Sequence, residues 1–160
     1  MMDNISLINF IDLTLEEKKM ILQWRNHNNI KCWMYTQDII LLENHLNFIE
    51  LLKQADDKLY FVIRKDKQYV GVIDFTQIID DRAYIGLYAN PSLKGIGKLL
   101  MDIIINYAFN VLNLKILCAE VLEKNKKALE LYKKNKFVEI DEKDINNSKV
   151  ICLELENENR

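Results

Sequence analysis

The stretch Asn125–Phe137, NKKALELYKKNKF, decides the fold. Asn125, Ala128 and Tyr132 are spaced i, i+3 and i+7, so a helix places them on one face. Taken singly, an asparagine at a helix start is an ordinary cap, and a tyrosine on a short helix is usually a core residue. The string becomes informative when it is paired with an upstream turn, Lys94–Lys98.

That turn, KGIGK, has the composition of an anion-binding site. It follows the strand-like run Ala83–Ala89 and precedes Leu99–Leu112, an apolar segment that predicts a buried helix. A helix start leaves backbone N–H groups unpaired and carries the positive end of the helix dipole, so it suits a pyrophosphate. Two glycines before a helix are more often an ordinary turn. The spacing matches neither a Walker loop nor the Rossmann fingerprint, because Leu100 stands where that fingerprint has glycine.

Length and composition predict a single domain over residues 1–160. Hydrophobic residues make up 49% of the chain, enough for a sizeable core, and the net charge of −2 gives no electrostatic case for nucleic acid. No apolar run approaches the ~20 residues of a membrane span. Asp3 lies where a signal peptide would be basic, so a cytoplasmic protein is expected.

The cysteines predict neither a disulfide framework nor a metal site. There are three, Cys32, Cys118 and Cys152, and none is paired at metal-ligand spacing. Cys118 and Cys152 lie in apolar runs and are expected to be small buried hydrophobes.

Periodicity and turn residues predict the order β-α-α-β-β-β-α-β-α-β-β. A capping box, Thr14 with Glu17, should start the first helix, and Gly86 should mark a bulge. The remaining helices are expected at Leu41–Lys53, Leu99–Leu112 and Lys124–Lys134. Strands are expected at Ile5–Ile11, Leu59–Arg64, Gln68–Ile78, Ala83–Ala89, Leu114–Val121, Phe137–Ile140 and Lys149–Leu155, the last two around a polar loop, Asp141–Ser148. We therefore expect an α/β architecture, a mixed sheet with helices on both faces.

Together the two motifs resemble the GNAT superfamily of N-acetyltransferases. Its Gln/Arg-x-x-Gly-x-Gly/Ala motif is matched at Gly95 and Gly97, but Ser92 stands at the first position. Its Asn-x-x-Ala-x-x-x-Tyr-x-x-x-Gly-Phe segment is matched except at the glycine, where this chain has Lys136. If that site needs a left-handed backbone, either Lys136 is strained or the turn shifts to Asn135.

The resemblance implies a GNAT fold that binds acetyl-CoA. Tyr132 would protonate the departing thiolate, since a phenol with an ordinary pKa of ~10 is protonated at neutral pH. Asn125 would contact the pantetheine arm, as would the strand Ala83–Ala89, with Leu87 and Tyr88 near the acetyl group. The pyrophosphate would be held by the backbone amides of Leu93, Lys94, Gly95, Ile96, Gly97 and Lys98.

The N-terminal third is expected to select the acceptor. Arginine and aromatic side chains suit a ligand with phosphates and a flat base. The alternative is that Trp24 and Phe48 are core residues and the two histidines are surface residues. The relevant segments are Trp24-Arg25-Asn26-His27, Met34-Tyr35, and His45 with Phe48.

These segments, with Gly71–Phe75 and Ala119–Val121, are similar to the nucleotide-sugar acetyltransferases of pseudaminic acid biosynthesis. That resemblance implies a substrate site lined by Arg25, Met34, Tyr35, His45, Phe48 and Tyr84. Glu120 would lie near the attacking amine, where a carboxylate binds the ammonium or takes its proton. Asp74 interrupts an apolar run and is a further candidate, the alternative being a solvent-facing strand residue.

The expected reaction is acetyl transfer from acetyl-CoA by direct attack in a ternary complex, without a metal. The acceptor implied by the resemblance is UDP-4-amino-4,6-dideoxy-N-acetyl-β-L-altrosamine. Acetylation of a protein N-terminus is the nearest alternative, and a catalytically idle CoA-binding domain is the second. The sequence leaves the oligomeric state open, a homodimer included.

Overall fold

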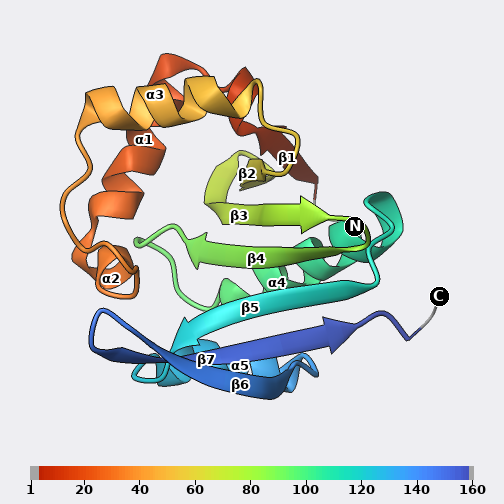
Figure 1. Cartoon of the computed structure of the whole chain (residues 1–160). Coiled ribbons are helices and arrows are strands. Elements are labelled where there is room, and N and C mark those ends of the chain that lie inside the picture. Colours follow the sequence, from red (N-terminus) through yellow and green to blue (C-terminus); the bar gives the residue numbers. More distant parts are fainter. Residues whose placement is uncertain (1–3, 159–160) are drawn as a thin grey trace.

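A seven-stranded mixed sheet in the order β1-β2-β3-β4-β5-β7-β6 forms the centre of the computed structural model, which describes residues 4–158 (Figure 1). Its strands are β1 (Ile5–Asn9), β2 (Leu59–Lys65), β3 (Gln68–Ile79), β4 (Arg82–Ala89), β5 (Ile116–Leu122), β6 (Val138–Ile145) and β7 (Ser148–Glu156). Its helices are α1 (Leu15–Asn26), α2 (Asn28–Lys31), α3 (Leu42–Leu52), α4 (Gly97–Asn106) and α5 (Lys126–Lys134), with a 3-10 turn η1 (Phe10–Asp12) and a π-helical turn η2 (Tyr107–Val111).

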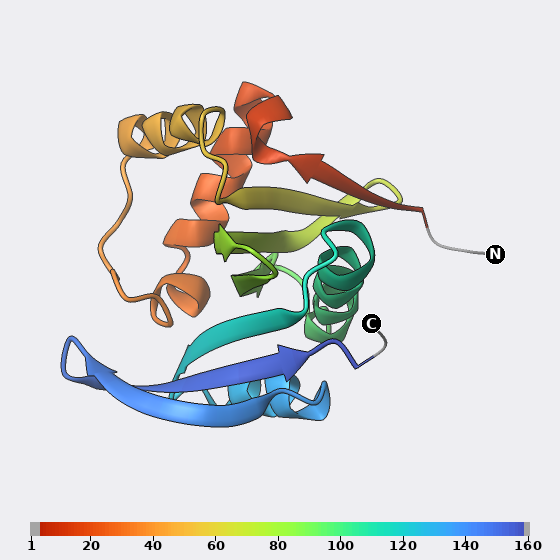
Figure 2. The same ribbon diagram turned by 45° about the vertical axis from the view of Figure 1, so that its right-hand side comes forward.

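Helices cover both faces of the sheet, as expected. On one face α1 and α3 pack through Ile21, Trp24 and Ile49 onto Val62 and Val72. The opposite face packs on α4 and α5 in a larger core, and Figure 2 shows α4 across the sheet from α1 and α3. Because strand side chains alternate, β1 to β4 contribute to both cores, whereas β5 and β7 contribute to the larger core. No helix within residues 4–158 combines the length and apolar character needed to cross a bilayer.

Strands β4 and β5 separate along their length, and this separation positions the site. They pair in parallel over only three positions, the last being Tyr84 with Cys118. Beyond that point the two strands diverge, toward the left of Figure 1. The β4 backbone after Tyr84 therefore has polar groups without a strand partner on this side, and such an edge can pair with an extended ligand.

The C-terminal strands differ from the prediction. The expected polar loop Asp141–Ser148 is wrong, because β6 continues to Ile145 and meets β7 in a tight hairpin. Its two turn residues, Asn146 and Asn147, have φ of 52° and 64°, the left-handed geometry that two-residue hairpins favour. β6 is an edge strand with little burial, so it lacks the apolar alternation that would have identified it.

Smaller differences have local causes. The first strand ends at Asn9, not Ile11, since the Asn9 side chain caps η1. Gly86 is not at a bulge: it pairs regularly with Asp74, and the irregularity lies between Thr76 and Ile79. The short α2 was not predicted, and α4 begins two residues earlier than expected and continues into η2. The capping box that starts α1 is confirmed.

Candidate active site

The predicted phosphate-binding turn lies between β4 and α4. Asn90 organises its start: the Ser92 amide donates to the Asn90 side chain at 2.9 Å, and the Leu93 amide donates to the Asn90 carbonyl, also at 2.9 Å. Gly95 has φ of +73°, a backbone conformation that residues other than glycine rarely adopt. Nothing lies within 4 Å of where its Cβ would be. The amides that follow are helix-start donors, which an α-helix leaves without an intrahelical partner. The turn thus fits an anion such as a pyrophosphate.

Lys98 belongs to this turn through its backbone, but its side chain points to the neighbouring helix. Its Nζ lies 2.8 Å from Asp102 and 2.9 Å from the Asn135 side chain. Lys98 therefore ties the start of α4 to the end of α5, and we expect its amide, not its ammonium, to face a phosphate. Gly97 packs against Leu131 of α5, 3.1 Å from the position of a Cβ, so the two helices lie close here.

Helix α5 carries Tyr132 into the core face of the sheet. Asn125 caps the helix by accepting from the Ala128 amide at 3.2 Å, which leaves its side-chain NH₂ for a ligand. Tyr132 is only 6% exposed and meets Phe137 edge to face, with ring centroids 5.0 Å apart. Burial, and then the negative charge of Asp74, raise the pKa of Tyr132, so its phenol stays protonated at neutral pH. Lys136 has φ of 73°, in the left-handed region. Of the two alternatives predicted for this turn, the structure therefore has the strained Lys136 and not a turn shifted to Asn135.

The strand β4 brings Leu87 and Tyr88 to its unpaired edge. Leu87 pairs with Ile73 and packs against the larger core, whereas Tyr88 pairs with Val72 and faces the opposite core. Burial raises the pKa of Tyr88, and the charge of Asp74 raises it further. Both residues lie past the last β4–β5 pair, where the backbone is free to contact a ligand.

Glu120 is held by two side chains from other elements. Tyr35 Oη donates to its Oε1 at 2.6 Å, and Lys143 Nζ lies 2.5 Å from its Oε2. The Glu120 side chain is 18% exposed and the Lys143 side chain 45%, so this ion pair is open to water on the side of the edge strand β6. Burial and then the bond to Glu120 raise the pKa of Tyr35, while the bond to Glu120 raises the pKa of Lys143. Lys143 was not among the predicted site residues, since it lies in the segment that was predicted as a loop.

Asp74 lies on the same sheet face, on the central strand β3. It pairs with Tyr60 on one side and with Gly86 on the other. Its Oδ2 lies 2.6 Å from where a Cβ of Gly86 would be, so only glycine leaves room for this carboxylate. No described residue hydrogen-bonds it, and burial raises the pKa of Asp74 to about 7.

Several predicted substrate-site residues gather around this face. Arg25 Nη2 donates to the Thr36 carbonyl at 3.1 Å, while Nη1 is buried and has no partner among the described residues. Phe48 packs edge to face on Tyr60, with centroids 5.1 Å apart, and Met34 packs at the edge of the same core. Tyr84 lies close enough to Glu120 for its charge to add to burial in raising the pKa of Tyr84.

His45 lies apart from this group. It is 6% exposed, and its Nε2 lies 2.9 Å from the Lys18 carbonyl of α1. Burial lowers the pKa of His45, so the ring is neutral at pH 7. The buried His45 ring therefore links α3 to α1. A role of His45 in substrate binding stays a prediction.

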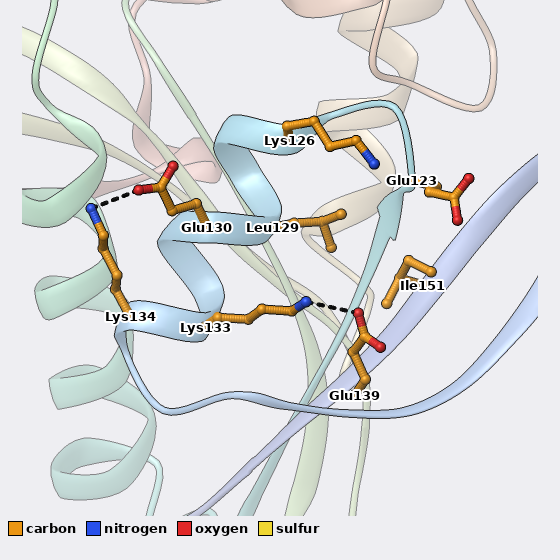
Figure 3. Close-up of a pocket in the computed structure, with 8 residues that line it drawn as sticks. All are labelled: Glu123, Lys126, Leu129, Glu130, Lys133, Lys134, Glu139 and Ile151. Carbon is orange, nitrogen blue, oxygen red and sulfur yellow. Dashed lines mark ion pairs between the residues drawn. The ribbon is translucent and has the colours of Figure 1, made fainter.

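A separate concavity lies on the outer side of α5 (Figure 3). Ion pairs cross its rim: Lys133 with Glu139 at 2.9 Å, and Lys134 with Glu130 at 2.8 Å. Its wall also contains Glu123, Lys126, Leu129 and Ile151, and none of the predicted site residues. Four of its charged groups form these two pairs, and Glu123 pairs with Lys149 outside the concavity, so we assign it no ligand.

Comparison with known proteins identifies the family. The model of the acetyltransferase (GNAT) family matches residues 18–137. The chain belongs to the GNAT family. This confirms the resemblance and the fold drawn from the glycine turn and the Asn125–Phe137 stretch, and the family match spans both motifs as well as β4 and β5.

Individual relatives agree with this assignment. The chain is 45% identical over 138 residues to acetyltransferase PseH of Campylobacter jejuni subsp. jejuni serotype O:23/36 (strain 81-176), covering 86% of this chain and 87% of that protein. The crystal structure of Campylobacter jejuni N-acetyltransferase PseH in complex with acetyl coenzyme A has a TM-score of 0.81 and 38% identity, covering 96% of this chain and 99% of that one. Spermidine N-acetyltransferase from Vibrio cholerae has a TM-score of 0.84 at 21% identity, which supports the fold alone.

Proposed function

We propose that this protein transfers an acetyl group from acetyl-CoA to the 4-amino group of a UDP-linked 4-amino-4,6-dideoxy sugar in pseudaminic acid biosynthesis. The single observation that carries the proposal is the divergence of β4 and β5 above the glycine turn, with Tyr132 buried beside it. The similarity to acetyltransferase PseH supports the choice of acceptor.

The donor half is supported by two features that fit acetyl-CoA. The amides at Lys94–Lys98 suit the pyrophosphate, whereas the predicted Leu93 amide already donates to the Asn90 carbonyl. The unpaired β4 edge suits the amide-bearing pantetheine arm. Asn125, beyond the end of β5, has a side-chain donor left for that arm. Acetyl-CoA supplies an activated thioester when it is bound.

Tyr132 is the proposed general acid. Its phenol is protonated at neutral pH, because both burial and the charge of Asp74 disfavour the phenolate. Protonating the thiolate as it leaves prevents the build-up of a negative charge in a buried site. A β4 backbone N–H near Tyr88 is the proposed donor to the carbonyl oxygen of the acetyl group.

The acceptor half is supported by side chains above the opposite face of the sheet. The buried, unpaired Nη1 of Arg25 is a donor that a phosphate could satisfy. Aromatic and apolar groups at Met34, Tyr35, Phe48 and Tyr84 provide flat surfaces for a base and a sugar. We propose that Glu120 lies near the acceptor nitrogen.

A thiol-release assay tests the proposal. The protein, acetyl-CoA and one acceptor at a time are incubated, and free CoA thiol is measured across UDP-amino sugars, dTDP-amino sugars and peptide N-termini. We expect turnover with a UDP-4-amino sugar and little with peptides. Faster turnover of peptide N-termini would refute the sugar assignment, and no turnover of any amine would leave only a CoA-binding domain.

A further inference from the structure

We infer that Asp74 is the general base, which takes a proton from the acceptor nitrogen. This inference rests on the proposed function and assigns a proton-transfer role to a residue that the sequence placed only among the substrate contacts. It also separates that role from Glu120, the carboxylate expected from the sequence.

The place of Asp74 in the sheet supports this role. It lies on β3 opposite Gly86, and Gly86 is two residues past the last β4–β5 pair. The carboxylate therefore lies on the sheet face proposed for the acceptor. It lies beside the part of β4 that has no β5 partner, where the acetyl-bearing arm is proposed to bind. The missing side chain at Gly86 leaves the space that Asp74 Oδ2 occupies, so the carboxylate lies directly against the β4 backbone.

The surroundings of Asp74 are suited to a base. The titratable groups that sense its charge are three phenols on separate elements: Tyr60 of β2, Tyr88 of β4 and Tyr132 of α5. Within residues 4–158 no cation pairs with it and no residue donates a hydrogen bond to it. Burial raises the pKa of Asp74 to about 7, near the value at which a base is effective in neutral solution.

Glu120 is less suited to that role. Both of its oxygens are engaged, one by the Tyr35 hydroxyl and the other by the Lys143 ammonium. To reach an acceptor proton, a Glu120 oxygen would have to give up one of these contacts. Glu120 can instead orient the acceptor while Asp74 moves the proton.

The acceptor enters as its ammonium ion. Asp74 takes one proton, so an N–H bond breaks and an O–H bond forms. The freed nitrogen lone pair forms the C–N bond, the C–S bond breaks, and Tyr132 gives its phenol proton to the sulfur. A second nitrogen proton restores the Tyr132 phenol through water, and Asp74 releases its proton to solvent.

The test compares Asp74→Asn with wild type over pH 6 to 9, using thiol release with the UDP-4-amino sugar. Asparagine keeps the shape and removes the base, so we expect kcat/KM to fall ~100-fold at pH 8. The ratio of wild type to variant should rise with pH up to about 7 and then level off. Ionisation of the acceptor affects both proteins equally and cancels in this ratio.

Two further measurements separate catalysis from structure. The acetyl-CoA Kd of the Asp74→Asn variant should stay within ~3-fold of wild type, a change below ~1 kcal/mol. Gly86→Ala should displace the carboxylate and lower turnover, but it should add little once Asp74 is already asparagine. As a matched control, Asp12→Asn changes an exposed aspartate and should leave both kcat/KM and its pH profile unchanged.

The outcomes are distinct. A loss confined to KM, or a ratio that does not change with pH, would show that Asp74 only contacts the substrate. Equal turnover of the variant and wild type would refute the base while leaving the proposed function intact. If wild type acetylates no amine, the proposed function fails and the base assignment fails with it.

Discussion

Replacing Asp74 by asparagine should stabilise the folded protein, and the gain should grow with pH. Burial raises the pKa of Asp74 from 3.8 to about 7, so the folded state binds its proton more tightly than the unfolded state does. Below 3.8 the carboxyl is neutral in both states and costs nothing. Between 3.8 and about 7 the unfolded chain ionises first, so wild-type stability falls as pH rises. Above that range the cost is constant.

The size of the effect follows from the shift. About 3 pH units at about 1.36 kcal/mol each give about 4 kcal/mol as an upper limit. Asp74 as a whole residue is only half-buried, so water reduces this cost, and we expect about 2 kcal/mol at pH 8. Roughly 1 kcal/mol of that should develop between pH 5 and pH 8.

Urea unfolding of wild type and Asp74→Asn at pH 5 and pH 8 measures this directly. The asparagine amide has its own burial cost, but that cost does not vary with pH, so the change between the two pH values is the informative quantity. Asp12→Asn serves as the exposed control and should show no such change. If the stability difference between wild type and Asp74→Asn is the same at both pH values, or reverses, the carboxylate has a partner in solution and the reasoning fails.

Three other substitutions test separate parts of the site. Tyr132→Phe should keep acetyl-CoA affinity but lower kcat by ~100-fold or more, and unchanged turnover would exclude it as the acid. Lys143→Met should free Glu120 and lower kcat ~10-fold with little change in acetyl-CoA Kd, and Lys143→Arg should restore most of it. Lys136→Gly should raise the free energy of unfolding by about 1 kcal/mol by relieving the left-handed backbone, whereas Lys136→Ala should not.

The features that could be predicted from the sequence are those whose contacts are local in the chain. Thr14 and Glu17 cap a helix three residues apart, and Asn125 caps the helix that carries Tyr132. The glycine turn likewise depends on adjacent residues, and its position between a strand and a helix was correct. Short-range hydrogen bonds leave a residue pattern that can be recognised without knowing the fold.

The features that could not be predicted depend on strand register. Lys143 reaches Glu120 only because β6 pairs with β7 and β7 with β5, and an exposed edge strand has no apolar alternation to reveal it. Similarly, the sequence suggested a bulge at Gly86, whereas in the structure Gly86 pairs with Asp74 and leaves room for its carboxylate. A glycine within a strand indicates close approach of some group, but the group itself comes from the neighbouring strand.

The two acidic residues on the acceptor face have opposite environments, and this contrast constrains the mechanism. Glu120 is ion-paired and hydrogen-bonded, so its carboxylate is fixed in position. Asp74 has no hydrogen-bond partner among the described residues, and burial raises the pKa of its carboxyl. A buried carboxyl with a strongly raised pKa is a candidate for proton transfer. The charge on Asp74 also raises the pKa of Tyr132, so the phenol stays protonated until it gives its proton to the departing sulfur. The base and the acid are thus coupled through the same buried charge, so Asp74→Asn should lower the pKa of Tyr132 as well as remove the base.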